Sequence, residues 1–89
     1  MTGRSMEEIK QFLKRSAAAL TNNPLVEREL DDFMPIQSIG IDSMQLIHLV
    51  VQIETEYDIV FEDDEMLLEN FKTIAIIADR IMMKLGVAL

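Results

Sequence analysis

The chain places its glycines and prolines in a few short regions, and this placement limits the fold more than any other feature of the sequence. Glycine occurs only at Gly3, Gly40 and Gly86, and proline only at Pro24 and Pro35. Because these residues interrupt regular elements, the long stretches between them are free to form continuous ones. The pattern favours helices over strands, with an irregular segment in the first half of the chain.

The first helix is expected over residues 5–21. Ser5 and Glu8 have the spacing of a capping box, in which each side chain accepts a hydrogen bond from the other residue's backbone N–H. The apolar side chains that follow share one helical face: Ile9, Phe12, Leu13 and Leu20. The Asn-Asn-Pro run at residues 22–24 then ends this helix.

Three further helices are expected over residues 42–57, 63–69 and 73–85. Asp42 and Thr73 are suitable N-cap residues, and acidic residues favour the start of the short helix between them. The periodicity places these residues in the core: Leu46, Ile47, Val50, Ile53 and Tyr57, then Ile74, Ile77, Ala78, Ile81 and Leu85.

Residues 25–41 show no clean period, so we expect a long loop there. Four of its apolar residues are expected to contact the core: Leu30, Phe33, Ile36 and Ile39. A chain of 89 residues is long enough for one small domain and not two. We therefore predict a single domain over residues 1–89 with an all-α fold, a bundle of three long helices and one short helix with a long first loop.

The charge of the chain excludes several classes of partner. Asp and Glu number 16 and Lys and Arg 8, which gives a formal net charge of −8. This charge repels nucleic acid and anionic membranes and attracts basic protein surfaces. Residues 29–71 contain no Lys or Arg but many acids. We expect their repulsion to raise several carboxyl pKa values and to make the fold more stable at mildly acidic pH.

The absence of cysteine excludes a disulfide framework, a thiolate metal site and a thiol nucleophile. Residues 1–10 contain no apolar stretch typical of a secretory signal, and no segment approaches the roughly 18 apolar residues of a membrane span. We expect a cytoplasmic protein without membrane attachment. The acids of residues 58–69 lack the central glycine of a calcium loop, so no metal site is expected.

The segment Ser38-Ile39-Gly40-Ile41-Asp42-Ser43-Met44 places a serine hydroxyl on the first turn of a helix. Helix N-termini favour negative charge, so a phosphodiester on Ser43 would be stabilised there, although ordinary capping explains the same Asp-Ser pair. A catalytic serine would need a base. The single histidine, His48, lies five residues on and about 140° around the helix, so we do not expect an enzyme.

The segment from Gly40 to Met44, GIDSM, resembles the G-x-D-S-L/M attachment motif of acyl and peptidyl carrier proteins. Residues 54–59, ETEYDI, are similar to the family's E-x-E-F-x-I helix end, and residues 71–74, FKTI, to the opening of its last helix. The resemblance implies a four-helix bundle with a long first loop. It also implies that a transferase attaches 4′-phosphopantetheine from coenzyme A to Ser43, with Asp42 helping to present the serine.

The resemblance further implies a carrier of acyl or aminoacyl thioesters and a set of partner enzymes. These are a phosphopantetheinyl transferase, an acyl- or aminoacyl-loading enzyme, and synthase and tailoring enzymes with basic docking surfaces. By the family's docking positions and the exposed character of the short helix, the expected partner contacts are Met44, Gln45, His48, Val51, Gln52 and Met66. We expect the carrier to be a monomer.

Departures from the common carrier patterns indicate a specialised pathway. Carriers of fatty acid synthesis usually have acids where this chain has Gln45 and His48, and often Asp in place of Ser38. Peptidyl carriers commonly show G-G-H/D-S, whereas Ile41 follows Gly40 here. We therefore expect polyketide or mixed polyketide–nonribosomal peptide biosynthesis. The alternatives are a carrier of fatty acid synthesis and an unmodified acidic helical adaptor that docks basic proteins.

Overall fold

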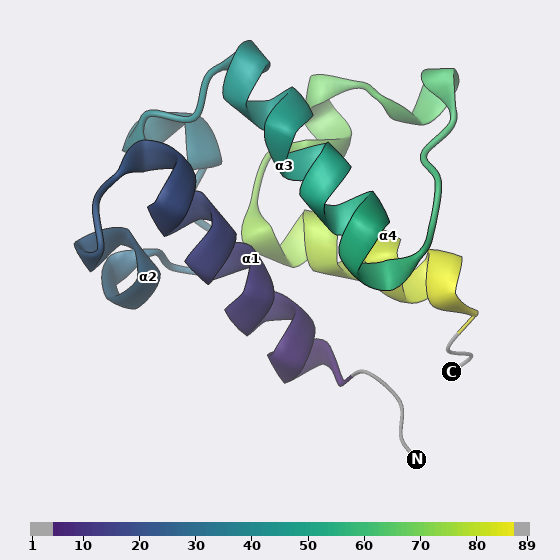
Figure 1. The fold of residues 1–89 in the computed structure, drawn as a ribbon, viewed down its shortest axis with the longest axis horizontal. Helices are drawn as coiled ribbons and strands as arrows, with labels where there is room; N and C mark the ends of the chain where they lie inside the picture. The colour runs from purple at the N-terminus through teal and green to yellow at the C-terminus, as the bar shows by residue number, and fades with distance from the viewer. Residues whose placement is uncertain (1–4, 87–89) are drawn as a thin grey trace.

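The computed structural model describes residues 5–86, and its regular elements are all helical (Figure 1). The α-helices are α1 (Met6–Thr21), α2 (Leu25–Glu29), α3 (Ser43–Tyr57) and α4 (Ile74–Leu85). Three short 3-10 helices complete the connections: η1 (Ile36–Ile39), η2 (Asp63–Glu65) and η3 (Leu68–Phe71). Helix α1 packs against α2, α3 and α4. The predicted all-α class is confirmed.

The predicted N-caps of the three long helices are confirmed. The N–H of Glu8 donates to Ser5 Oγ at 3.1 Å, and the N–H of Ser5 donates to Glu8 Oε1 at 3.1 Å. Asp42 Oδ1 accepts from the N–H of Gln45 at 2.9 Å at the start of α3. Thr73 Oγ1 accepts from the N–H of Ile76 at 3.2 Å at the start of α4. Each cap satisfies a backbone donor that the helix itself leaves unpaired.

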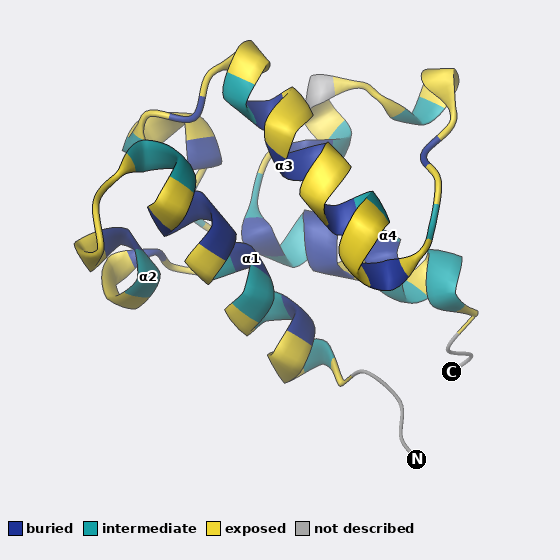
Figure 2. Cartoon of the chain, viewed as in Figure 1, coloured by how far each residue is buried: buried dark blue, intermediate teal, exposed yellow. Residues whose placement is uncertain are grey.

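The core is formed by one face of each long helix (Figure 2). On α3 one residue of the predicted core was wrong: Leu49 is fully buried, whereas Ile47 is 51% exposed. The buried residues of this helix are Leu46, Leu49, Val50, Ile53 and Tyr57. This set repeats at helical spacing, and Ile47 lies to one side of it. Apolar side chains occupy so much of the circumference of α3 that the helical period alone did not distinguish Ile47 from Leu49.

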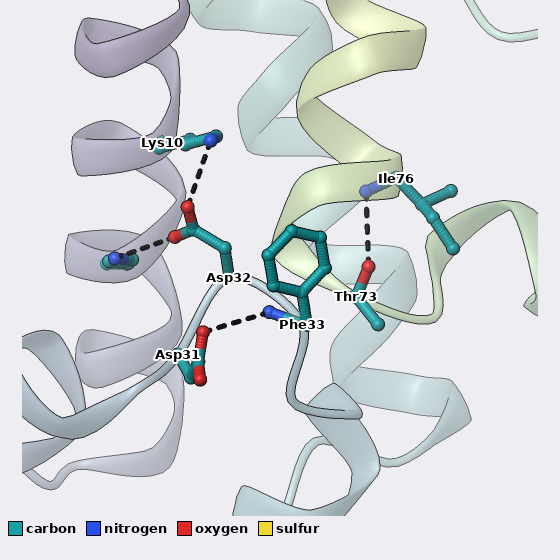
Figure 3. A network of polar contacts seen from close by, with 7 residues as sticks. Lys10, Asp31, Asp32, Phe33, Thr73 and Ile76 are labelled. Carbon is teal, nitrogen blue, oxygen red and sulfur yellow. Dashed lines mark hydrogen bonds and ion pairs between the residues drawn. The ribbon is translucent and has the colours of Figure 1, made fainter.

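The first connection is more ordered than the predicted loop, since it contains α2 and η1. Leu30 and Ile36 are buried as expected, and Ile39 is partly buried against the core. Phe33 was wrongly placed in the core, because its side chain is 75% exposed. The carboxylate of the preceding residue, Asp32, is directed toward α1 (Figure 3), so an ion pair, and not the burial of Phe33, fixes this segment.

Asp32 joins the first connection to both α1 and α4. Its carboxylate lies 2.9 Å from Lys10 Nζ and 2.9 Å from Lys14 Nζ on α1 (Figure 3). Its backbone oxygen accepts from the N–H of Ala75 at 2.9 Å, in the first turn of α4. The hydrogen bond from Lys10 and then that from Lys14 hold the pKa of Asp32 below its ordinary value. The pKa of Lys10 is raised, chiefly by the same bond.

The second connection contains two 3-10 helices where the sequence predicted one short α-helix over residues 63–69. Glu65 accepts from Lys84 Nζ on α4 at 2.6 Å and from the N–H of Glu62 at 2.7 Å. These bonds, that of Lys84 first, lower the pKa of Glu65. Both bonds are made by Glu65, so they fix the first half of the segment to α4, and the segment then continues as a second 3-10 helix. Phe61 is buried, edge-to-face with Phe71 at 5.2 Å between ring centroids.

The acidic stretch is therefore compensated by basic residues from distant parts of the chain. Lysines of α1 and α4 reach Asp32 and Glu65, and both carboxyl pKa values fall. The predicted rise in carboxyl pKa is wrong for these two groups. The sequence shows that the stretch itself lacks Lys and Arg, but it does not show which cations the fold brings to it.

Candidate functional site

Ser43 is the first residue of α3, and its side chain is exposed. Asp42, the N-cap, uses Oδ1 to accept the N–H of Gln45, so its carboxylate closes the first turn. In the described part of the chain, residues 5–86, the Ser43 hydroxyl makes no hydrogen bond. The hydroxyl is thus free to react, while the turn that carries it is fixed by the neighbouring side chain.

The loop before Ser43 explains why the motif contains a glycine. Gly40 ends η1 with φ 100°, a conformation that residues with a Cβ rarely adopt. Its N–H donates to the backbone oxygen of Gln37 at 3.2 Å. Ile41, the next residue, is 1% exposed and anchors the loop in the core. The chain therefore reverses at Gly40, is fixed at Ile41, and presents Asp42 and Ser43 at the surface.

The start of α3 suits a negatively charged group on Ser43. The first N–H groups of a helix have no intrahelical acceptor, and the helix dipole favours an anion there. Asp42 already satisfies the N–H of Gln45, which leaves the N–H groups of Ser43 and Met44 as the donors nearest the hydroxyl. A phosphodiester on this hydroxyl therefore fits the residues that surround it.

A pocket of about 240 Å³ lies beside this turn. Its apolar lining comes from buried residues that include Ile41, Leu46 and Phe71, and its polar lining includes Asp42 and Lys72. Asp42 thus contributes both to the cap and to the pocket. The arrangement places an exposed nucleophilic oxygen next to a small cavity with an apolar floor.

Most of the predicted partner contacts on α3 are exposed. Met44 and Val51 are 69% and 53% exposed, and His48 and Gln52 are also exposed. Ile47, which the sequence analysis placed in the core, lies between them with 51% of its surface exposed. We call Met44, Ile47 and Val51 the apolar stripe of α3. Their spacing of three and four residues places them on one side of the helix, and this spacing is the sequence signal that could have grouped Ile47 with Met44 and Val51.

Gln45 and Met66 differ from that exposed group. Gln45 is partly buried, and its Nε2 donates to the backbone oxygen of Leu20 at 3.0 Å. Met66 follows η2 and is 38% exposed, so it belongs to the second connection and not to α3. The structure therefore places four of the six predicted partner contacts on the exposed surface of one helix.

Comparison with known proteins identifies the family of the chain. A family model described as the phosphopantetheine attachment site matches residues 9–81. The chain belongs to this family. It is also 32% identical over 68 residues to the acyl carrier protein homolog of Mycoplasma pneumoniae, an alignment that covers 73% of this chain and 79% of the relative. No solved structure matches the chain.

Membership of this family makes the chain a carrier protein and not a catalyst. Its prosthetic group is phosphopantetheine, bound covalently to a serine, and the carrier is a substrate of the enzymes that modify it. Within the described residues, no helix is long and apolar enough to cross a membrane, and no cluster of three or more acidic or histidine side chains is arranged to hold a metal ion.

Proposed function

We propose that Ser43 is the serine that carries the phosphopantetheine group. The observation that supports this assignment is the state of the three serines within the matched residues 9–81. Ser16 is buried, with 7% of its surface exposed. Ser38 is exposed, but its hydroxyl donates to the backbone oxygen of Pro35 at 2.6 Å. Ser43 combines exposure with a hydroxyl that has no partner among the described residues.

The protein's own residues prepare the serine for a transferase. Asp42 fixes the first turn of α3, so the hydroxyl is presented at a defined end of a rigid helix. The N–H groups of that turn stabilise the phosphodiester charge. When attached, the group supplies a thiol that holds acyl or aminoacyl cargo as a thioester. A chain without cysteine thereby acquires thiol chemistry.

We further propose that the partners are a phosphopantetheinyl transferase, an acyl- or aminoacyl-loading enzyme, and synthase and tailoring enzymes. They would dock on the apolar stripe of α3 and on His48 and Gln52 beside it. An apolar stripe next to polar side chains favours partner surfaces that are apolar and carry few charges where they contact α3 close to Ser43. Acids elsewhere on the chain would attract basic partner surfaces over longer distances. The carrier would act as a cytoplasmic monomer.

The pathway we propose is polyketide or mixed polyketide–nonribosomal peptide biosynthesis. Its support is the absence of a carboxylate at Gln45 and His48, where carriers of fatty acid synthesis usually have acids. A role in fatty acid synthesis is the alternative pathway. Loading assays with malonyl, longer acyl and aminoacyl donors would separate the two, since a preference for fatty acyl chains alone contradicts the proposal.

The assignment of Ser43 is tested by intact-mass measurement after incubation with coenzyme A, Mg²⁺ and a transferase of broad specificity. Wild type should gain one phosphopantetheine, Ser43→Ala should gain none, and the matched control Ser38→Ala should gain one. Modification of Ser43→Ala would show that the site is wrong. An unmodified wild type, under conditions that load a known carrier, would favour the acidic adaptor instead.

A further inference from the structure

Gln45 connects α3 to the end of α1. Its Nε2 donates to the backbone oxygen of Leu20 at 3.0 Å, across 25 residues of sequence. Leu20 lies in the last turn of α1, where carbonyl groups have no intrahelical donor. The bond therefore satisfies a carbonyl at one helix end with a side chain from the first turn of another helix.

This bond is the only direct polar link from that turn to another helix among the described residues. Apart from the backbone ladder of α3 itself, the other hydrogen bonds of residues 40–46 run within the segment 36–46. The Asp42 cap is one of them, since it joins residues 42 and 45. The cap thus shapes the turn, and Gln45 fixes its place relative to α1.

The same side chain leaves its other polar atom without a partner. Gln45 Oε1 is buried and accepts no hydrogen bond within residues 5–86. Reversing the amide would not relieve this, because it would turn Oε1 toward the Leu20 oxygen. A buried acceptor without a donor is unfavourable, and this cost offsets part of the stabilisation that the bond to Leu20 provides. The net contribution of this glutamine to stability is therefore small, whereas its bond still fixes the position of the turn.

We infer that Gln45 is a positioning residue for the modification of Ser43, because it holds the first turn of α3 against the end of α1. This inference rests on the proposed role of Ser43. Without the bond, the turn occupies the position that a transferase binds for only part of the time. Partial occupancy weakens apparent affinity and leaves the rate from the bound complex unchanged. Loss of Gln45 should therefore raise KM for the carrier and spare kcat.

The test compares wild type with Gln45→Met, which removes both polar atoms at similar length, and Gln45→Glu, which replaces the donor with a carboxylate oxygen at the same length. Gln11→Met, at an exposed position of α1, is the matched control. We expect about a three- to tenfold rise in KM for both Gln45 variants, with kcat within about twofold of wild type. Gln45→Met removes the unpaired Oε1 but also leaves the Leu20 oxygen without its donor, so its melting temperature should stay close to that of wild type. Gln11→Met should match wild type throughout.

Amide hydrogen exchange of Gln45 and Leu46, whose N–H groups both bond to Asp42, separates positioning in the free protein from direct contact with the transferase. Positioning requires faster exchange of these amides in both Gln45 variants and unchanged exchange in Gln11→Met. An unchanged KM, or a raised KM with unchanged exchange, would overturn the inference. If wild type itself is not modified, the role of Ser43 fails, and unchanged exchange in the variants would independently show that no tether exists.

Discussion

Two faces of α3 carry similar side chains but stand in different surroundings. One face, formed by Leu46, Leu49, Val50, Ile53 and Tyr57, is covered by the rest of the bundle (Figure 2). The other, the apolar stripe of Met44, Ile47 and Val51, is more than half exposed at every position. The side-chain types overlap, so residue chemistry does not decide which face is covered. The packing of the remaining elements decides it.

The difference assigns different tasks to the two faces. Burial of apolar surface stabilises the folded chain, so the covered face contributes to folding. The apolar stripe gains little from folding, and any free energy it supplies is available when another molecule covers it. One helix therefore connects the core with the surface that we propose for partners, and Ser43 stands at its beginning.

Leu49→Ala and Ile47→Ala give the sharpest test of this difference, because the two original side chains are isomers. Leu49→Ala should lower the free energy of unfolding by about 2–5 kcal/mol, since Leu49 is fully buried. Ile47→Ala should change it by at most about 0.5 kcal/mol, because half of that side chain is exposed and alanine favours helices. Urea unfolding measures both, and equal losses would mean that the two faces are wrongly assigned.

The second prediction concerns the apolar stripe in a complex. The double variant Ile47→Ala, Val51→Ala should raise KM for the transferase about three- to tenfold, because it deletes apolar contact at the proposed docking surface. Steady-state modification of Ser43 measures this. Met83→Ala is the matched control, since Met83 is also apolar and 67% exposed but lies on α4. An equal effect of Met83→Ala would argue against a specific stripe.

The parts of the fold that the sequence predicts are those set by neighbouring residues. The capping box of Ser5 and Glu8, and the caps at Asp42 and Thr73, depend on residues three positions apart. Such signals are readable without tertiary structure. The presentation of Ser43 follows from the same local chemistry, which is why its geometry agrees with the expectation from its motif.

The parts that the sequence missed depend on contacts between distant residues. Phe33 is exposed, and its segment is fixed instead by the ion pairs of Asp32 with two lysines of α1, about twenty residues earlier in the chain. Helix α2 was missed because it is only five residues long and buries only Val26. The bond from Gln45 to Leu20 was not predicted, because it depends on where α1 ends. No local pattern contains that information.

Asp32→Asn tests whether the packing of α1 and α4 over the buried face of α3 depends on the ion pairs of Asp32. Asp32 connects α1, through Lys10 and Lys14, with α4, through the N–H of Ala75. The side chains of this cluster are 19–24% exposed, so solvent weakens each pair. The variant should lose about 1 kcal/mol of stability at pH 7 and leave KM for the transferase unchanged. A changed KM would mean that the packing behind the buried face of α3 also affects the apolar stripe on its exposed face.

The pH dependence of the same variant gives the smallest effect and a defined sign. The folded pKa of Asp32 is lowered, so its ion pairs stabilise the fold fully above the unfolded pKa of about 3.9. That stabilisation disappears as pH falls through the folded pKa, because the unfolded chain takes up the proton first. The difference between wild type and Asp32→Asn should therefore stay constant from about pH 7 to 5 and shrink below about pH 4. Urea unfolding across this range measures it, with Asp64→Asn, an exposed acid of η2, as the control. If Asp32→Asn is instead more stable than wild type at pH 7, repulsion among the acids, and not pairing with Lys10 and Lys14, dominates at Asp32.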